Sequence, residues 1–174
     1  LLREKMIEYL NINIDRDENI VIIADSLNLD IKNKLTSIFP NSIKIKPEFE
    51  GYVLPELLDS LLVDSLPNKV IVESEIFTLV SSIVSQLNSQ ITPERDVRLY
   101  TTYKGNQYDD PSIDIKNLGD LRFTYPSISK KIRSDSITDF KENYKDLFGS
   151  LPNSDVVRGY DITKDIVLRI LLDN

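Results

Sequence analysis

The segment Asn19-Ile20-Val21-Ile22-Ile23-Ala24-Asp25-Ser26 carries the strongest fold signal in this chain. Its four consecutive large apolar residues, 20–23, do not alternate with polar ones, so other parts of the chain must cover both faces of the segment. A run this short, rich in β-branched side chains, predicts a central strand of a parallel sheet. Asp25 and Ser26 follow it directly, at the carboxyl end where open α/β sheets usually bind ligands.

Strands and helices are expected to alternate along the rest of the chain. Strands are expected at 42–46, 70–72, 96–101 and 121–125, and helices with apolar residues at helical spacing at 2–10, 31–39, 54–62 and 76–87. Ser74 is the expected N-cap of the helix at 76–87, with Glu75 complementing its dipole. This alternation predicts βαβ units, and hence a doubly wound, mainly parallel α/β sheet of about five strands with helices on both faces.

The chain is expected to divide near residue 126. Residues 1–126 would form the α/β lobe, and residues 127–174 a polar crossing or hinge followed by C-terminal helices. One helix would start at Ser136 and end at Gly149, and the last would start at about Ile162. The buried face of the first helix is expected to consist of Ile137, Phe140, Tyr144, Leu147 and Phe148. In the last helix Ile162, Ile166, Ile170 and Leu171 recur at helical spacing.

Composition excludes several classes of function. The formal net charge is −7, from 21 Lys and Arg against 28 Asp and Glu, so the surface repels phosphate backbones and nucleic acid is not the expected partner. The chain has no Cys and no His, which excludes thiol nucleophiles, disulfides, Ser-His-Asp triads and zinc sites with such ligands. No run approaches the ~18 apolar residues that span a bilayer. Because the chain begins at Leu1 without a Met, we expect a fragment or a processed product.

Nucleotide-binding and hydrolase motifs are also missing. The sequence contains no GxGxxG, no GxxxxGK[ST] and no GxSxG, and it has only five glycines. We therefore expect no bound cofactor and no enzymatic activity.

Two carboxylates at expected strand ends are candidate functional groups. Asp25 and Glu73, together with Asp30 or Asp96, could bind a divalent cation through oxygen ligands. The alternative is that they are solvated strand-end or helix-capping residues. A response-regulator receiver domain would need a phospho-acceptor Asp after the third strand and a Lys after the fifth, but Glu73 and Tyr125-Pro126 stand there.

A third cluster is aromatic and hydroxylic. Tyr100, Thr101, Thr102 and Tyr103 end the expected fourth strand. Tyrosines offer flat contact area with a hydrogen-bonding tip, which suits a small polar ligand. The alternative is that these tyrosines pack beneath neighbouring helices.

Four short motifs near the C-terminus carry a family resemblance. They are Phe123-Thr-Tyr-Pro-Ser127, Phe140-Lys-Glu-Asn-Tyr144, Phe148-Gly-Ser-Leu-Pro152 and Val157-Arg-Gly-Tyr-Asp161. In this order they resemble type I periplasmic-binding proteins, specifically the Leu/Ile/Val-binding-like branch of Bacteroidetes cell-envelope proteins, which is sometimes joined to a LysM domain. In that family Gly159, Tyr160 and Asp161 would match a structural turn before the last helix.

The resemblance implies a two-lobed receptor of the periplasm or cell envelope that closes on a small molecule by a hinge motion. This chain would be its second lobe plus crossover helices returning to a first lobe that is missing here. The ligand, amino-acid-like or derived from the cell wall, would lie near Asp25, Ser26, Glu73, Ser74, Tyr100 and Tyr103. No metal is expected there. The alternatives are a structural or regulatory interaction domain that kept the fold without a ligand, and a receiver-like domain using Asp25 and Glu73 with Mg²⁺.

Overall fold

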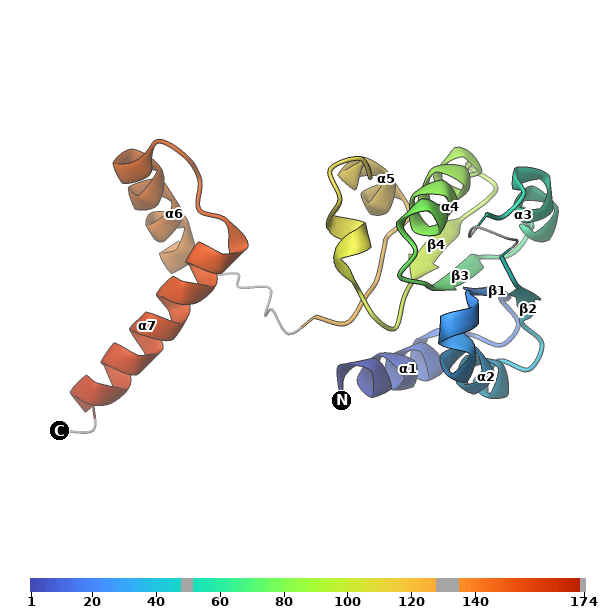
Figure 1. Ribbon diagram of the computed structural model, residues 1–174, viewed down its shortest axis with the longest axis horizontal. Coiled ribbons are helices and arrows are strands. Elements are labelled where there is room, and N and C mark those ends of the chain that lie inside the picture. The colour runs from blue at the N-terminus through green and yellow to red at the C-terminus, as the bar shows by residue number, and fades with distance from the viewer. Residues whose placement is uncertain (48–51, 128–134, 173–174) are drawn as a thin grey trace. The chain divides into compact units, whose positions relative to one another are not determined.

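The computed structural model describes residues 1–47, 52–127 and 135–172 (Figure 1). Within it the chain divides into two compact units, Leu1–Ile128 and Ser129–Asn174. The first unit contains the sheet and its covering helices, and the second contains two helices.

A four-stranded parallel sheet forms the centre of the first unit. Its strands are β1 (Asn19–Ala24), β2 (Ile43–Ile45), β3 (Asn68–Glu73) and β4 (Val97–Tyr100), in the spatial order β2-β1-β3-β4. The predicted Rossmann-like α/β fold with a parallel sheet is therefore confirmed, with four strands in place of about five. In this strand order the chain reverses its direction of winding between β1 and β3, and ligand sites of doubly wound sheets lie at the carboxyl ends of such a strand pair.

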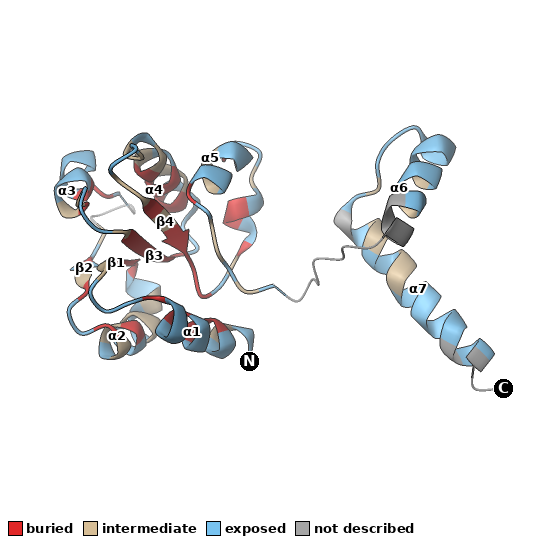
Figure 2. Cartoon of the chain, turned by 180° about the vertical axis from the view of Figure 1, so that it is seen from behind, coloured by how far each residue is buried: buried red, intermediate tan, exposed pale blue. Residues whose placement is uncertain are grey.

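Helices cover both faces of the sheet (Figures 1 and 2). Helices α1 (Leu2–Asn13) and α2 (Leu29–Ile38) pack on one face, while α3 (Pro55–Leu61), α4 (Phe77–Ser89) and α5 (Ile115–Asp120) pack on the other. Two short 3₁₀ helices, η1 (Ser26–Asn28) and η2 (Asn106–Asp109), follow β1 and β4.

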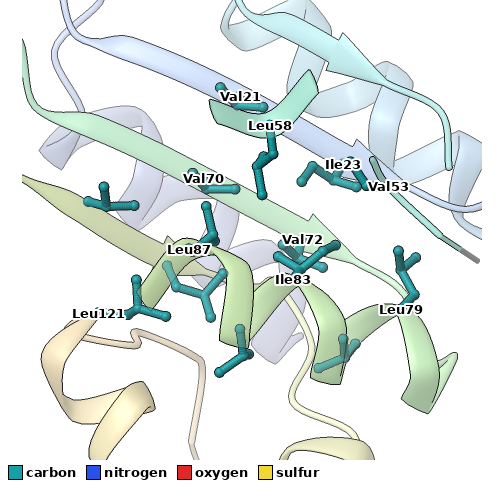
Figure 3. Packing of buried hydrophobic residues seen from close by; sticks show 14 of the residues in the cluster. Val21, Ile23, Val53, Leu58, Val70, Val72, Leu79, Ile83, Leu87 and Leu121 are labelled. Atoms are coloured by element: carbon teal, nitrogen blue, oxygen red, sulfur yellow. The ribbon is translucent and has the colours of Figure 1, made fainter. Parts of the chain in front are cut away.

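The side chains of β1 alternate between two apolar cores. Val21 and Ile23 join the core that contains Leu79, Ile83 and Leu87 of α4, as Figure 3 shows. Ile20 and Ile22 join the opposite core with Leu10 of α1 and Leu35 of α2. Both faces of the strand are thus buried, which explains why the run 20–23 shows no polar alternation.

Two asparagines fix the register of the central strands at their amino ends. Asn19 pairs with Asn68 across β1 and β3, and its Nδ2 donates to Asn68 Oδ1 at 2.8 Å. The fully buried Asn68 amide also accepts from the backbone N–H of Val63 and donates to the carbonyls of Val63 and Asp96. A buried amide that is satisfied in this way tolerates only one strand alignment.

The expected fifth strand at 121–125 is reduced to a single parallel bridge between Thr124 and Tyr100. Arg122 has a φ of +47°, and its N–H bonds to the carbonyl of Gly119, so the chain is still turning as it leaves α5. Only Leu121 and Thr124 bond to the backbone of β4. The strand-like composition of this segment was misleading because the turn after α5 controls its backbone.

Two helix starts also differ from expectation. Helix α4 begins at Phe77, three residues beyond Ser74, and no side chain caps it. The last helix begins at Ser154 and not near Ile162, so Gly159, Tyr160 and Asp161 lie inside a helix and form no turn. Nothing lies within 4 Å of the position a Gly159 Cβ would take, so packing does not oppose a helix there.

The second unit is a helical hairpin of α6 (Asp135–Phe148) and α7 (Ser154–Leu172). Gly149 ends α6 with a φ of +74° and a bond to the carbonyl of Lys145, as expected. Phe140 stacks on Tyr160 with ring centroids 4.0 Å apart. Leu147 and Phe148 are not buried as expected but 78% and 65% exposed. The apolar residues Ile162, Ile166, Ile170 and Leu171 of α7 are also exposed. The expected hinge at 127–135 lies largely outside the described residues.

Candidate functional site

Side chains join the carboxyl ends of β1 and β3. Asp25 Oδ1 accepts from the backbone N–H groups of Leu27 and Asn28 at 2.9 and 3.1 Å, which caps η1. Asp25 Oδ2 accepts from the Ser74 hydroxyl at 2.6 Å, and both residues are buried. Ser74 therefore bridges to β1 and does not cap α4. Each oxygen of the Asp25 carboxylate has a donor within the protein.

Glu73 is buried between β3 and β4 with a side chain only 1% exposed. Its two oxygens accept from the backbone N–H and the hydroxyl of Thr102, at 2.5 and 2.7 Å. A nitrogen of the Arg3 guanidinium lies 4.0 Å from Glu73 Oε2. Burial raises the pKa of the Glu73 carboxyl above its usual value, while the Thr102 bonds and Arg3 act in the opposite direction.

The core near Glu73 contains the ring of Tyr108. This ring is buried and stacks on Phe123 with centroids 4.5 Å apart. Burial, with the nearby negative charge of Glu73 as a second cause, raises the pKa of the Tyr108 hydroxyl. The phenol therefore stays neutral next to Glu73.

We call Asp25, Glu73, Ser74, Thr101 and Thr102 the inner cluster. All five residues are at most 6% exposed. Their polar atoms are used in bonds among themselves and with nearby backbone, including the bond from Thr101 Oγ1 to the carbonyl of Tyr103 at 2.9 Å. The inner cluster thus fills the space between the carboxyl ends of the central strands.

The other three residues expected at the site lie in different surroundings. Ser26 is exposed at the start of η1. Tyr100 is 7% exposed and belongs to the core under α1 and α2, and the charged groups that influence its hydroxyl, Arg98 and Glu18, lie toward the amino ends of the strands. Tyr103 is 48% exposed at the carboxyl edge. The structure therefore separates Tyr100 from the other expected residues.

A groove lies beside the inner cluster at the same edge of the sheet. It has a volume of about 440 Å³, within the range of small-molecule sites. We call it the outer groove, and its walls are Glu75, Phe77, Tyr103, Gly105, Asn106, Gln107 and Asp110. These residues come from the segments that follow β3 and β4, so the ends of two adjacent strands position them.

Gln107 connects the outer groove to the inner cluster. Its Nε2 donates to the carbonyl of Ser74 at 2.8 Å, and the side chain is 9% exposed. Gly105 leaves room for this carboxamide, because a Cβ on Gly105 would lie 2.1 Å from Gln107 Oε1. Gly105 and Gln107 thus pack against each other and together form one wall of the outer groove.

Two aromatic rings line the groove. Phe77 and Tyr103 are 37% and 48% exposed. The Arg3 guanidinium lies over the Tyr103 ring, 5.2 Å from its centroid. The Tyr103 ring therefore already contacts a cation of the protein itself.

A larger hollow of about 560 Å³ is lined only by consecutive residues, 108–115. It belongs to one loop and does not reach the strand ends. The outer groove draws its walls from two strand ends and contains Tyr103, so we take it as the candidate site.

Metal binding at the strand ends has little support in this geometry. Asp25 and Glu73 use their oxygens in internal hydrogen bonds. Within residues 1–47, 52–127 and 135–172, no three His, Cys, Asp or Glu side chains gather as they would around a metal ion. Among these residues, no helix combines the length and apolar character needed to cross a membrane.

The sequence reasoning did not identify Phe77, Gln107 or Asp110. The signal that could have found Gln107 and Asp110 is position, because the segment 104–111 leaves β4 at the same edge where β1 and β3 end. Phe77 is the first residue of α4 and is 37% exposed, and the apolar periodicity of that helix does not single it out.

Comparison of the chain with protein-family models, with curated proteins and with solved structures found no match.

Proposed function

We propose that this chain is a non-enzymatic ligand-binding domain, the second lobe of a two-lobed receptor similar to type I solute-binding proteins. The observation that carries the proposal is the outer groove at the carboxyl edge of a doubly wound parallel sheet, next to the strand pair where such sheets bind ligands. The groove is open to solvent, and in the proposed receptor a facing lobe would close it. Its ligand would be a small polar molecule.

Binding is favoured over catalysis by the state of the titratable groups. The carboxylates Asp25 and Glu73 accept hydrogen bonds from Ser74 and Thr102 and are 5% and 1% exposed, so a substrate in the groove has little access to them. The chain has neither His nor Cys to serve as base or nucleophile. The exposed groups of the groove can hold a ligand without transforming it.

The helical unit fits the role of a crossover toward a first lobe. The apolar residues Ile162, Ile166, Ile170 and Leu171 repeat at helical spacing on α7 and are 51–65% exposed. A helix of this kind is stabilised when its apolar side packs against another element. In the proposed receptor that element belongs to the first lobe, the lobes close by hinge motion, and the protein works in the periplasm or cell envelope.

Isothermal titration of the full-length protein against amino acids, short peptides and cell-wall fragments tests the proposal. We expect saturable binding of one compound, together with a decrease in the radius of gyration in small-angle scattering as the lobes close. Absence of binding by the whole panel, with the outer groove covered by a tightly packed partner surface, would exclude a solute receptor.

A second candidate is an interaction domain that kept the fold without a ligand. The exposed apolar residues of α7 favour it, because such a surface also suits a protein partner. The two candidates differ in one measurement. Substitution of Tyr103 and Phe77 by Ala would abolish solute binding in the receptor and would leave an association through α7 intact.

A further inference from the structure

A continuous path of hydrogen bonds joins the outer groove to η1 across the carboxyl ends of three adjacent strands. It starts at Gln107, after β4, whose Nε2 donates to the carbonyl of Ser74 at 2.8 Å. The hydroxyl of Ser74, which follows β3, donates to Asp25 Oδ2 at 2.6 Å. Asp25 Oδ1 in turn accepts from the backbone N–H groups of Leu27 and Asn28. The path therefore runs from a wall of the groove to the segment that follows β1.

Helix η1 depends on Asp25 for its conformation. None of its three residues is buried, and Leu27 is 85% exposed, so apolar packing does not hold it in place. Asp25 Oδ1 accepts from Asn28 Nδ2 at 2.9 Å in addition to the two backbone N–H groups. A surface segment that is held by polar contacts to one residue opens at low cost in free energy when that residue moves.

Gln107 controls the Ser74 end of the path. Ser74 is 6% exposed, and no other described residue donates to its carbonyl. A buried carbonyl that loses its donor turns toward water, because an unsatisfied buried group costs free energy. The Ser74 hydroxyl accepts from the N–H of Ile76 at 3.0 Å, so its direction is tied to the same stretch of backbone. A turn of this peptide would therefore also move the hydroxyl away from Asp25.

We propose that this path couples the outer groove to η1. An occupant of the groove that holds Gln107 against Ser74 keeps the Asp25 cap of η1 in place, and one that draws Gln107 away loosens η1. No hydrogen bond joins Gln107 to η1 directly among the described residues, so the effect passes through Ser74 and Asp25. The coupling goes beyond the proposed function, because it is a property of the chain without a ligand.

Hydrogen exchange tests the coupling in the ¹⁵N-labelled full chain. Exchange of the Leu27 and Asn28 amides is measured by magnetisation transfer from water. Gln107→Met keeps the side-chain length and removes the donor, while Gly105→Ala displaces an unchanged Gln107, since the new Cβ would lie 2.1 Å from its Oε1. Each should raise both exchange rates by about threefold or more. Gly119→Ala should leave them unchanged, because nothing lies within 4 Å of its Cβ position.

A second background shows whether Ser74 transmits the effect. Ser74→Ala removes the hydroxyl but keeps the carbonyl that binds Gln107, so it interrupts the path in the middle. In this background Gln107→Met should no longer change the exchange of Leu27 and Asn28. The amide of the fully buried Ile22, in β1, exchanges when the sheet opens and corrects each variant for a change in global stability.

Two results would overturn the proposal. One is unchanged exchange of Leu27 and Asn28 in both Gln107→Met and Gly105→Ala. The other is an equal increase with and without the Ser74 hydroxyl, which would show that the effect does not pass through Ser74. Neither result depends on the proposed function, because no solute is present in the measurement.

Discussion

The inner cluster and the outer groove are neighbours in sequence but differ in exposure and in how many of their polar side chains bond within the protein. Ser74 belongs to the inner cluster and bonds to Asp25, while the next residue, Glu75, bonds to no described residue. The buried Glu73 accepts two hydrogen bonds from Thr102, while the exposed Glu75 lines the groove. The comparison shows that residues at the strand ends can serve the fold while the binding surface lies just beyond them.

The largest effect of breaking the inner cluster is expected for Glu73→Ala. The substitution removes the acceptor of both the N–H and the hydroxyl of the fully buried Thr102 and leaves a cavity between β3 and β4. We expect the free energy of unfolding to fall by about 3 kcal/mol. Urea denaturation followed by circular dichroism measures it, and a loss below about 1 kcal/mol would show that Glu73 does not stabilise this edge.

Asp25→Ala should have the next largest effect. It removes the cap of η1 and the acceptor of the Ser74 hydroxyl, so we expect a loss of about 2 kcal/mol in the same measurement. Asp25→Asn is the matched control, because its amide oxygen can still cap η1 and its amide nitrogen can donate to Ser74. An equal loss in both variants would mean that the charge, and not the hydrogen-bond geometry, is what matters.

Gly105→Ala should disturb the wall that the two regions share. The new Cβ would lie 2.1 Å from Gln107 Oε1, so the carboxamide must move and its bond to the Ser74 carbonyl is lost. Because the side chain can swing away, the expected loss is about 1 kcal/mol. Gly119→Ala provides the control, since nothing lies within 4 Å of its Cβ position. Thermal unfolding measures the stability change of each variant relative to the unchanged protein, and only Gly105→Ala should be destabilised.

The raised pKa of Glu73 predicts a pH effect with a definite sign. The native carboxyl binds its proton more tightly than the unfolded one, whose pKa is near 4.5. Between pH 4.5 and the raised native pKa, the native state therefore binds more protons at Glu73 than the unfolded state does. The free energy of unfolding falls with rising pH across this interval and stops falling above it. In Glu73→Gln this fall should be absent. Denaturation curves at several pH values, taken as the difference between the two proteins, isolate the effect.

The smallest effect on stability is expected in the outer groove. Glu75 is exposed and unbonded within the described chain, so Glu75→Gln should change the free energy of unfolding by less than about 0.5 kcal/mol. A destabilisation above about 1 kcal/mol would show that Glu75 belongs structurally to the inner cluster. This result would remove the distinction between the two regions.

The fold was predictable where the sequence pattern has only one structural explanation. The unbroken apolar run 20–23 requires cover on both faces, and the stripe of Val80, Ile83 and Leu87 requires a helix packed on the sheet. The segment 121–125 had strand composition, but the turn at Arg122 comes from the preceding helix. Local composition cannot reveal such a constraint.

The candidate site was only partly predictable. The strand-end rule led to Asp25, Glu73 and Ser74, but the hydrogen bonds that engage them come from Thr102 and from each other across the sheet. Those partners are 29 and 49 residues apart in the chain. Gln107 joins the groove because the carbonyl of Ser74, just after β3, orients its amide. Tertiary contacts of this kind have no signature in a single sequence.

The paired asparagines at the start of β1 and β3 also constrain the order in which the chain can fold. Asn19 finds its partner 49 residues later, at Asn68, and Asn68 in turn bonds to Asp96. During synthesis β1 therefore cannot complete its hydrogen bonds with β3 until the whole segment through β3 has left the ribosome. Until then both apolar faces of β1 are uncovered and can associate with other chains. The strand at the centre of the native sheet is thus also a segment that the nascent chain must protect from misassembly.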